Sequence, residues 1–300
     1  MTIKVLLNPY SNRWNAKLRW PEGESALKAA GADFSLDVSE DAGQLEGLAT
    51  KAVRDGYDTV VVAGGDGSIG EVVNGVARDW RPGEEFPAKL GVLPMGSAND
   101  FAFAMGLPLD LNEAAKIIAS GRSKQVDLCQ CNERLFLNNS GAALEPYVTT
   151  KQERIQWIKG AMRYLVAAAW AIMDKPEWQG QIEWDGGKHS GPLSLISVGN
   201  GRRTGGFFMT PHADPFDGKL TLAFGYRSTR WGLFSALPRA FKPGKGSYVE
   251  LPGMCEVNCT RVLIHLEKPS PAHTDGVLYK RWLTDFDYRI FPATVPVLMQ

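Results

Sequence analysis

The stretch Val60-Val-Val-Ala-Gly64-Gly65-Asp66-Gly67-Ser68 combines a buried-strand pattern with a glycine-rich turn. A helical pattern follows over residues 69–78, with apolar side chains at i, i+3, i+4 and i+7. Glycines let a ligand approach the backbone closely, and the free N–H groups at a helix start attract phosphate. The turn therefore predicts a phosphate site, although an ordinary strand–helix turn has the same spacing.

Asp66 favours the phosphate interpretation. A carboxylate inside a phosphate-binding turn would repel its ligand unless a divalent cation lay between them. The turn matches neither the Walker A loop nor the G-x-G-x-x-G fingerprint, because no Lys-Ser/Thr pair follows it and its glycines are spaced differently. We therefore expect a phosphate site of another kind, one that works with a metal ion.

A second turn of this type, Pro94-Met95-Gly96-Ser97-Ala98-Asn99-Asp100, follows a buried-strand pattern over residues 89–93. The first strand pattern, over residues 3–8, ends in Asn8-Pro9-Tyr10-Ser11. In parallel sheets, ligands bind at the carboxyl ends of the strands. Because packing alone does not explain three polar strand ends at one edge, we expect a ligand site there.

Strand and helix patterns alternate through the first 124 residues, which predicts a helix-covered parallel sheet. Strand patterns dominate after that point and favour an antiparallel β-sandwich. We predict an α/β domain that carries the phosphate site over residues 1–124 and a C-terminal β-sandwich domain over residues 125–287. The last strand, at about 288–300, is a candidate to join the first domain.

Local signals place several turns and helix ends. Asp110 and Glu113 form a capping box, and Gly121 ends the helix that follows them. The sequence Asp185-Gly186-Gly187 predicts a hairpin. In the second half, only residues 151–173 have a convincing helical pattern, which predicts one long helix.

Charge and composition exclude several classes of protein. Lys and Arg number 33 and Asp and Glu number 33, so the chain lacks the basic excess of a nucleic-acid binder, and we expect no nucleic-acid partner. The start has no secretory pattern, and the apolar stretch over 155–173 is interrupted by Lys159 and Arg163. We expect a cytoplasmic protein whose four cysteines are reduced core thiols. The oligomeric state stays open, a homodimer included.

Residues 219–248 contain six basic residues and no acidic one, with aromatic residues between them. Anionic lipids attract such cations, and aromatic side chains favour the membrane interface. We expect either peripheral contact with the inner face of a membrane or a solvated face above buried aromatics. The stretch over 155–173, with Trp157, Tyr164 and Trp170, could line a groove for an acyl chain; the alternative is an ordinary core helix.

Together these segments resemble the diacylglycerol kinase catalytic-domain family, bacterial soluble lipid kinases related to sphingosine and NAD kinases. The family's GGDGT and NEVVNG motifs correspond to residues 64–75, and its LGVLPxGTxNDFAR motif to residues 90–102. Residues 136–141, 205–220 and 274–276 resemble its domain-crossing segment, its GG…P-x-A…DGxL stretch and its DGE motif. The resemblance covers nearly the whole chain in the right order. It implies that residues 1–124 form an ATP-binding α/β domain, that residues 125–287 form a β-sandwich domain for the lipid substrate, and that the protein uses ATP and Mg²⁺.

The resemblance also implies a set of site residues. The implied nucleotide contacts are Asn8, Pro9, Ser11, Asn12, Ser39, Gly64, Gly65, Asp66, Gly67, Ser68, Gly70 and Ser97. The implied catalytic residues are Asp66, Asp100 and Asp127, which would hold Mg²⁺ through waters, and Asp275, which would orient the substrate hydroxyl. A structural Mg²⁺ is implied on the Asp217 carboxylate and the backbone carbonyls of Asp214 and Lys219.

Three positions depart from the family pattern in ways that affect the chemistry. Asn12 stands where the family usually has Gly, and Gly70 where it usually has Asn. Val277 replaces the DGE glutamate, which is often assigned as the proton acceptor. Either Asp275 takes the proton, or a base is dispensable, or the protein no longer phosphorylates anything.

We therefore predict an ATP- and Mg²⁺-dependent lipid kinase that transfers the γ-phosphate to the hydroxyl of a membrane lipid such as diacylglycerol. Two alternatives remain open. One is a kinase of a soluble hydroxylated metabolite, which would have no use for the basic and aromatic segment 219–248. The other is a catalytically impaired, nucleotide-binding lipid sensor, which Val277 motivates.

Overall fold

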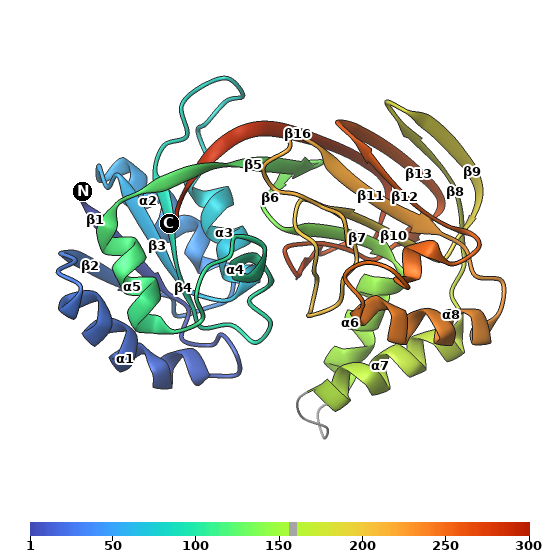
Figure 1. The fold of residues 1–300 in the computed structure, drawn as a ribbon, viewed down its shortest axis with the longest axis horizontal. Coiled ribbons are helices and arrows are strands. Elements are labelled where there is room, and N and C mark those ends of the chain that lie inside the picture. Colours follow the sequence, from blue (N-terminus) through green and yellow to red (C-terminus); the bar gives the residue numbers. More distant parts are fainter. Residues whose placement is uncertain (156–160) are drawn as a thin grey trace.

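The computed structural model describes residues 1–155 and 161–300, and its two halves lie side by side along the long axis (Figure 1). In the N-terminal half, parallel strands stand in the order β2–β1–β3–β4, as the alternating pattern predicts. Helix α1 packs with α5, and α2 packs with α3. The elements are β1 (Ile3–Leu7), α1 (Asn15–Ala29), β2 (Phe34–Val38), α2 (Gln44–Arg54), β3 (Thr59–Gly64), α3 (Asp66–Val76), β4 (Lys89–Pro94), α4 (Asp100–Ala104) and α5 (Leu111–Ser120).

The predicted helix ends around α5 are confirmed. The Asp110 side chain accepts hydrogen bonds from the backbone N–H groups of Asn112 and Glu113, at 2.9 and 3.0 Å. Gly121 ends the helix in the left-handed region, with φ 67°. These ends depend on neighbouring residues alone, which is why the local sequence was sufficient to place them.

The C-terminal half contains a six-stranded antiparallel sheet in the order β12–β11–β10–β7–β14–β15. A second layer, formed by β13, β8 and β9, packs against it, so the predicted β-sandwich is confirmed. The predicted hairpin is also present, with Trp184 paired to Gly187 across Asp185-Gly186. The strands are β6 (Arg134–Phe136), β7 (Asn139–Ala143), β8 (Trp178–Trp184), β9 (Gly187–Leu193), β10 (Leu195–Gly199), β11 (Leu220–Gly225), β12 (Met254–Cys259), β13 (Arg261–Ser270), β14 (Ala272–Thr274) and β15 (Val277–Leu278).

Two long strands, β5 (Ser123–Cys131) and β16 (Leu283–Leu298), connect the halves and arch across Figure 1. One end of β16 pairs with β13 of the sandwich. At its other end, Val297 pairs with Leu90 of β4, in parallel. The two halves therefore share one continuous sheet, and the C-terminal end of β16 lies between β4, to which it is parallel, and β5, to which it is antiparallel.

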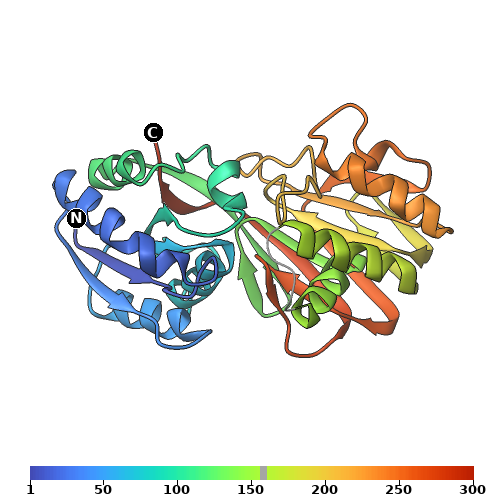
Figure 2. The ribbon, with the colours of Figure 1, turned by 90° about the horizontal axis from the view of Figure 1, so that it is seen from below.

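Helices cover one face of the sandwich, where α6 (Leu144–Arg154) packs with α7 (Ala161–Asp174), and α7 packs with α8 (Arg230–Ala236). Figure 2 shows α6 and α7 in green and α8 in orange on this face. The prediction of one long helix over 151–173 was wrong, because Ile155 adopts an extended conformation, ψ 97°, that ends α6. Trp157 lies outside the described residues. In the described part of the chain, no helix is long and apolar enough to cross a membrane.

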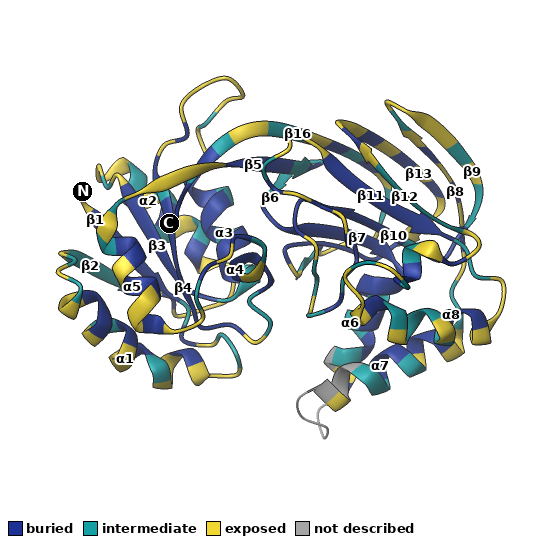
Figure 3. Ribbon diagram, in the orientation of Figure 1, coloured by how far each residue is buried: buried dark blue, intermediate teal, exposed yellow. Residues whose placement is uncertain are grey.

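Burial follows the two layers. The central strands of both halves are buried throughout, whereas the outer faces of α1, α7 and α8 are exposed (Figure 3). All four cysteines are free thiols, and Cys129 and Cys131 lie fully buried on one face of β5, as its alternation predicts. These thiols contribute packing to the sandwich core.

Candidate active site

Polar side chains that follow three strands meet at the carboxyl edge of the parallel sheet. The Asn8 Nδ2 donates to the Ser68 Oγ at 2.9 Å, and the Ser11 and Ser68 hydroxyls are 3.2 Å apart. The Ser97 Oγ donates to the Asn12 Oδ1 at 2.9 Å. The three strand ends that the sequence predicted to converge are therefore in contact with one another.

The two glycine turns pack backbone against backbone. A Cβ built on Gly96 would lie 2.5 Å from the Gly65 Cα, and one built on Gly65 would lie 2.9 Å from the Gly96 Cα. Both positions thus require glycine, because a side chain at either one would collide with main-chain atoms. This contact holds the starts of α3 and α4 next to each other.

The other implied nucleotide contacts surround these turns. Gly64, Gly67 and Gly70 belong to the end of β3 and the first turns of α3, and Pro9 follows β1. Ser39 follows β2 and is buried, with its backbone N–H donating to the Leu7 carbonyl. Asn12 adopts φ 51°, a left-handed conformation. This conformation explains how Asn occupies a position where the family pattern has Gly, because Asn tolerates it better than most residues.

Asp66 and Asp100 lie together at the first residues of α3 and α4. The Asp66 Oδ1 accepts a hydrogen bond from the backbone N–H of Phe101 at 2.8 Å. Burial raises the pKa of Asp66, and burial together with the Asp66 carboxylate raises the pKa of Asp100 to about 6. The region thus concentrates negative charge that favours binding of a cation or a proton.

Asp275 reaches the same group of carboxylates from the sandwich. It occupies the tight turn between β14 and β15, with φ 47°. Its carboxylate accepts three backbone hydrogen bonds of 2.9 to 3.0 Å, from the N–H groups of Leu137, Asn138 and Asn139. Burial nevertheless raises its pKa to about 6, and the nearby Asp66 contributes to this shift. Asp275 is therefore fixed in position and poorly solvated.

Asp127 has a different set of partners. Its two carboxylate oxygens accept from the backbone N–H groups of Gly218 and Ala293, both at 2.7 Å. It thereby joins β5 to the loop before β11 and to the irregular part of β16. In that loop, the Asp217 Oδ1 accepts from the Lys219 N–H at 2.9 Å, and the Asp214 Oδ1 accepts from the Phe216 N–H at 3.1 Å.

The carboxylates of Asp66, Asp100 and Asp275 fit a hard divalent cation. They supply oxygen atoms, and a cation would offset the repulsion between them. Within the described residues, no group of three or more His, Cys, Asp or Glu side chains is arranged to ligate a metal directly. A cation there would consequently retain waters between itself and the carboxylates, as Mg²⁺ commonly does.

Two family models match the chain. The family model "Diacylglycerol kinase catalytic domain" matches residues 2–131, and the model "YegS C-terminal NAD kinase beta sandwich-like domain" matches residues 140–299. A diacylglycerol kinase of Staphylococcus aureus (strain MRSA252) is 32% identical over 222 residues, which cover 73% of this chain and 69% of that protein. The chain belongs to the diacylglycerol kinase family.

Further diacylglycerol kinase relatives support this assignment. The diacylglycerol kinase of Staphylococcus carnosus (strain TM300) is 28% identical over 276 residues, covering 91% of this chain and 87% of that protein. A diacylglycerol kinase structure from Bacillus anthracis str. Sterne superposes with a TM-score of 0.73 at 20% identity, covering 100% of this chain and 97% of that one. The structural likeness shows the fold. Family membership makes this protein a kinase, as its sequence motifs predicted.

Three further residues contact this group of carboxylates or the turn that holds Asp275. Arg203 forms an ion pair with Asp100, and Glu145 is hydrogen bonded to His273, two residues before Asp275. Their partners lie 103 and 128 positions away in the chain. No local motif marked them, since each acquires its role through a contact between distant segments.

Proposed function

We propose that this kinase transfers the terminal phosphate of ATP, with Mg²⁺, to the hydroxyl of a membrane lipid such as diacylglycerol. The observation that carries the proposal is an apolar cavity in the C-terminal half, beside the turn that holds Asp275. The glycine turns would supply the phosphate side of the reaction, and the cavity offers an apolar lining for part of a lipid. Relatives named diacylglycerol kinase support this substrate class.

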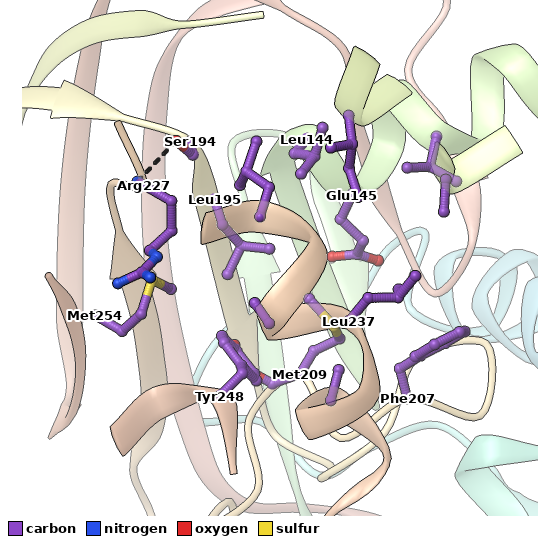
Figure 4. Close-up of a pocket in the computed structure, with 16 residues that line it drawn as sticks. Leu144, Glu145, Ser194, Leu195, Phe207, Met209, Arg227, Leu237, Tyr248 and Met254 are labelled. Atoms are coloured by element: carbon purple, nitrogen blue, oxygen red, sulfur yellow. Dashed lines mark hydrogen bonds between the residues drawn. The ribbon is translucent and has the colours of Figure 1, made fainter. Parts of the chain in front are cut away.

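The cavity lies between the six-stranded sheet and the helices that cover it (Figure 4). Its volume is about 80 Å³, and aliphatic side chains dominate its lining, among them Val148, Ala168, Ile172, Leu233 and Leu237. Such a lining favours hydrocarbon over a polar metabolite. The cavity therefore supports a lipid acceptor over the soluble metabolite that the sequence left open.

One carboxylate points into this apolar space. Figure 4 shows Glu145 directed into the cavity near Leu237 and Met209. Its Oε1 is 2.6 Å from the His273 Nε2, whereas its buried Oε2 has no hydrogen-bond partner. A buried polar atom without a partner costs about 1–3 kcal/mol, which a hydroxyl donor on a lipid would relieve. The cavity thus suits an apolar molecule that carries a hydroxyl.

Hydrogen bonds connect the Glu145 carboxylate, through His273, to the turn that holds Asp275. The His273 Nδ1 accepts from the Gly276 N–H at 3.3 Å, and Gly276 directly follows Asp275. The inner end of the cavity is therefore close to the residue that would orient the acceptor hydroxyl. The N–H groups at the α3 start would bind the phosphate chain, and Mg²⁺ would neutralise charge on the transferred phosphoryl group.

The outer side of the same helices suits a membrane surface. Trp231 of α8 is 83% exposed and Phe241 is 52% exposed. Cationic side chains accompany them, at Arg230, Lys242 and Lys245. Phe224 is buried, so the aromatics of residues 219–248 divide between the core and the surface. We propose that α8 and the residues after it rest on anionic lipid, directly above the cavity.

Val277 motivates a second candidate function, a nucleotide-binding lipid sensor with impaired catalysis. A Cβ built on Gly67 would lie 3.3 Å from the Val277 Cγ2, so residue 277 faces the start of α3. In this chain an apolar side chain occupies the position of the family's DGE glutamate. Asp275 remains as the acid–base group in the lipid-kinase proposal.

The test is transfer of labelled phosphate from ATP to a panel of acceptors in mixed micelles. We expect diacylglycerol to be labelled, and expect no labelling of acetyl-capped diacylglycerol or of free glycerol. Ala168→Phe should narrow the cavity and raise the KM for lipid while ATP binding stays unchanged; Ala169→Phe, one position along α7 and outside the cavity lining, is the matched control. Binding of ATP without labelling of any acceptor would favour the sensor.

A further inference from the structure

Arg203 brings a cation from the sandwich to the start of α4. The residue lies in the loop that follows β10, and its Nη2 is 3.0 Å from the Asp100 Oδ1. The backbone N–H of Gly206, in the same loop, also points to the Asp100 carboxylate, at 3.2 and 3.3 Å. The loop is therefore anchored on the N-terminal half through one carboxylate.

Two aromatic rings fix the guanidinium in this position. Its Cζ lies 4.2 Å from the centroid of the Phe103 ring and 5.9 Å from that of Phe208. These rings come from opposite halves of the molecule and contact each other edge to face at 6.1 Å. Cation–π contacts of this kind orient the planar group and leave its edge free for hydrogen bonds.

The guanidinium has hydrogen-bonding capacity that the protein leaves unused. Its Nε is buried without a hydrogen-bond partner, whereas the side chain as a whole retains 20% exposure. The Asp100 carboxylate pairs with one terminal nitrogen of the guanidinium, the Nη2. An arginine held in this way can bind a further anion, and its fork matches the oxygens of a phosphate.

The Arg203 guanidinium lies next to the phosphate-binding turns. Asp100 is followed by Phe101, whose N–H donates to Asp66, the first residue of α3. The Arg203 guanidinium thus binds Asp100, the residue next to Phe101, whose N–H joins the start of α4 to that of α3. Negative charge dominates there, since Asp66, Asp100 and Asp275 lie together. A triphosphate would need a cation at this end of the site.

We infer that Arg203 binds the terminal phosphate of the nucleotide, with Asp100 and the two phenylalanine rings holding it in place. The inference rests on the proposed use of ATP and assigns one specific contact within it. Arg203 would be supplied by the sandwich, so the phosphate site would be complete only when both halves contribute.

The test is titration calorimetry with ATP and with ADP, each with Mg²⁺, without any lipid acceptor. Arg203→Gln should weaken ATP binding by about ten- to a hundredfold, the value of hydrogen bonds to a charged group, and ADP binding by less than about threefold. Arg203→Lys, which keeps the charge and loses the fork, should give a smaller loss that is again confined to ATP. Arg202→Gln, the same change at the exposed neighbouring residue, should leave the ATP-to-ADP affinity ratio unchanged.

The outcomes separate this inference from the proposed function. An unchanged ATP-to-ADP ratio in Arg203→Gln overturns the role of Arg203 while leaving the kinase proposal intact. If that variant does not fold, an unchanged ratio in Arg203→Lys overturns it equally. If the wild-type protein binds neither nucleotide, both the inference and the proposed function fail.

Discussion

Gly70 in α3 faces Asp275 so closely that a Cβ built on Gly70 would lie 3.1 Å from the Asp275 Cβ. Asp275 has little freedom to yield, because three backbone N–H groups hold its carboxylate. The contact between these two residues sets how near the sandwich carboxylate comes to the phosphate-binding helix. Gly70 stands where the family pattern has Asn.

We predict that Gly70→Ala lowers the rate of phosphoryl transfer by about tenfold or more, because it displaces Asp275 from the phosphate site. The gain in helix propensity, about 1 kcal/mol, should be cancelled by the crowding. Gly47→Ala in α2 is the control, since a Cβ there meets nothing within 4 Å. Urea unfolding should show stabilisation in Gly47→Ala alone; equal stabilisation in Gly70→Ala would contradict the contact.

Gly96→Ala should disrupt both glycine turns, because its Cβ would lie 2.5 Å from the Gly65 Cα. Two backbone segments must then separate, and we expect a loss of about 2–4 kcal/mol of unfolding free energy together with loss of nucleotide binding. Gly244→Ala, at a position with open space, should change neither property. Thermal melts and ATP titration of the two variants provide the comparison, and normal ATP binding by Gly96→Ala would refute the expectation.

Asp275 should make the stability of the protein depend on pH in a defined window. Burial raises its folded-state pKa from 3.8 to about 6, so the folded state binds the proton more tightly than the unfolded state. Its contribution to stability is therefore fully present below pH 4 and is lost as the pH rises through 6, at a cost of up to about 3 kcal/mol.

Asp275→Asn removes this titration. Between pH 4 and pH 7, the wild type should lose more unfolding free energy than the variant, which the difference between their urea-unfolding curves measures. Parallel pH dependences in the two proteins would show that Asp275 does not titrate in this window.

Val277→Glu should raise the turnover rate by about a hundredfold or more, since general-base assistance typically contributes about 10²–10⁴-fold. The side chain at 277 already faces the α3 start at Gly67, so a carboxylate there would reach the reacting region. Val277→Gln, of the same size but without basicity, should not raise the rate. Steady-state assays with saturating lipid compare the three proteins, and no gain in Val277→Glu would place the proton acceptor elsewhere, with Asp275 as the first candidate.

Trp231→Ala and Phe241→Ala should each weaken binding to vesicles that contain anionic lipid by about tenfold, because both side chains are exposed on the proposed membrane face. Leu18→Ala removes an equally exposed apolar side chain from α1 and should have no effect. Co-sedimentation at low and high salt measures both contributions, since salt weakens the part due to the basic residues. Unchanged binding in both aromatic variants would exclude this face.

Features that depend on near neighbours could be predicted from the amino-acid sequence. The apolar runs of β3 and β4 predicted buried parallel strands, Asp110 and Gly121 fixed the ends of α5, and the glycine turns marked the ligand edge of the sheet. Such signals depend on residues a few positions apart. The local pattern did not reveal the end of α6 at Ile155. The extended backbone of this residue divides the single helix that was expected.

Which charged groups meet depends on contacts between distant parts of the chain. Three contacts join segments that lie more than 100 positions apart. They are the ion pair between Arg203 and Asp100, the hydrogen bonds from residues 137–139 to Asp275, and the hydrogen bond between His273 and Glu145. The energy of such a contact depends on burial and on a distance of about 3 Å. Those quantities arise when β5 and β16 bring the two halves together, so no local pattern of residues encodes them.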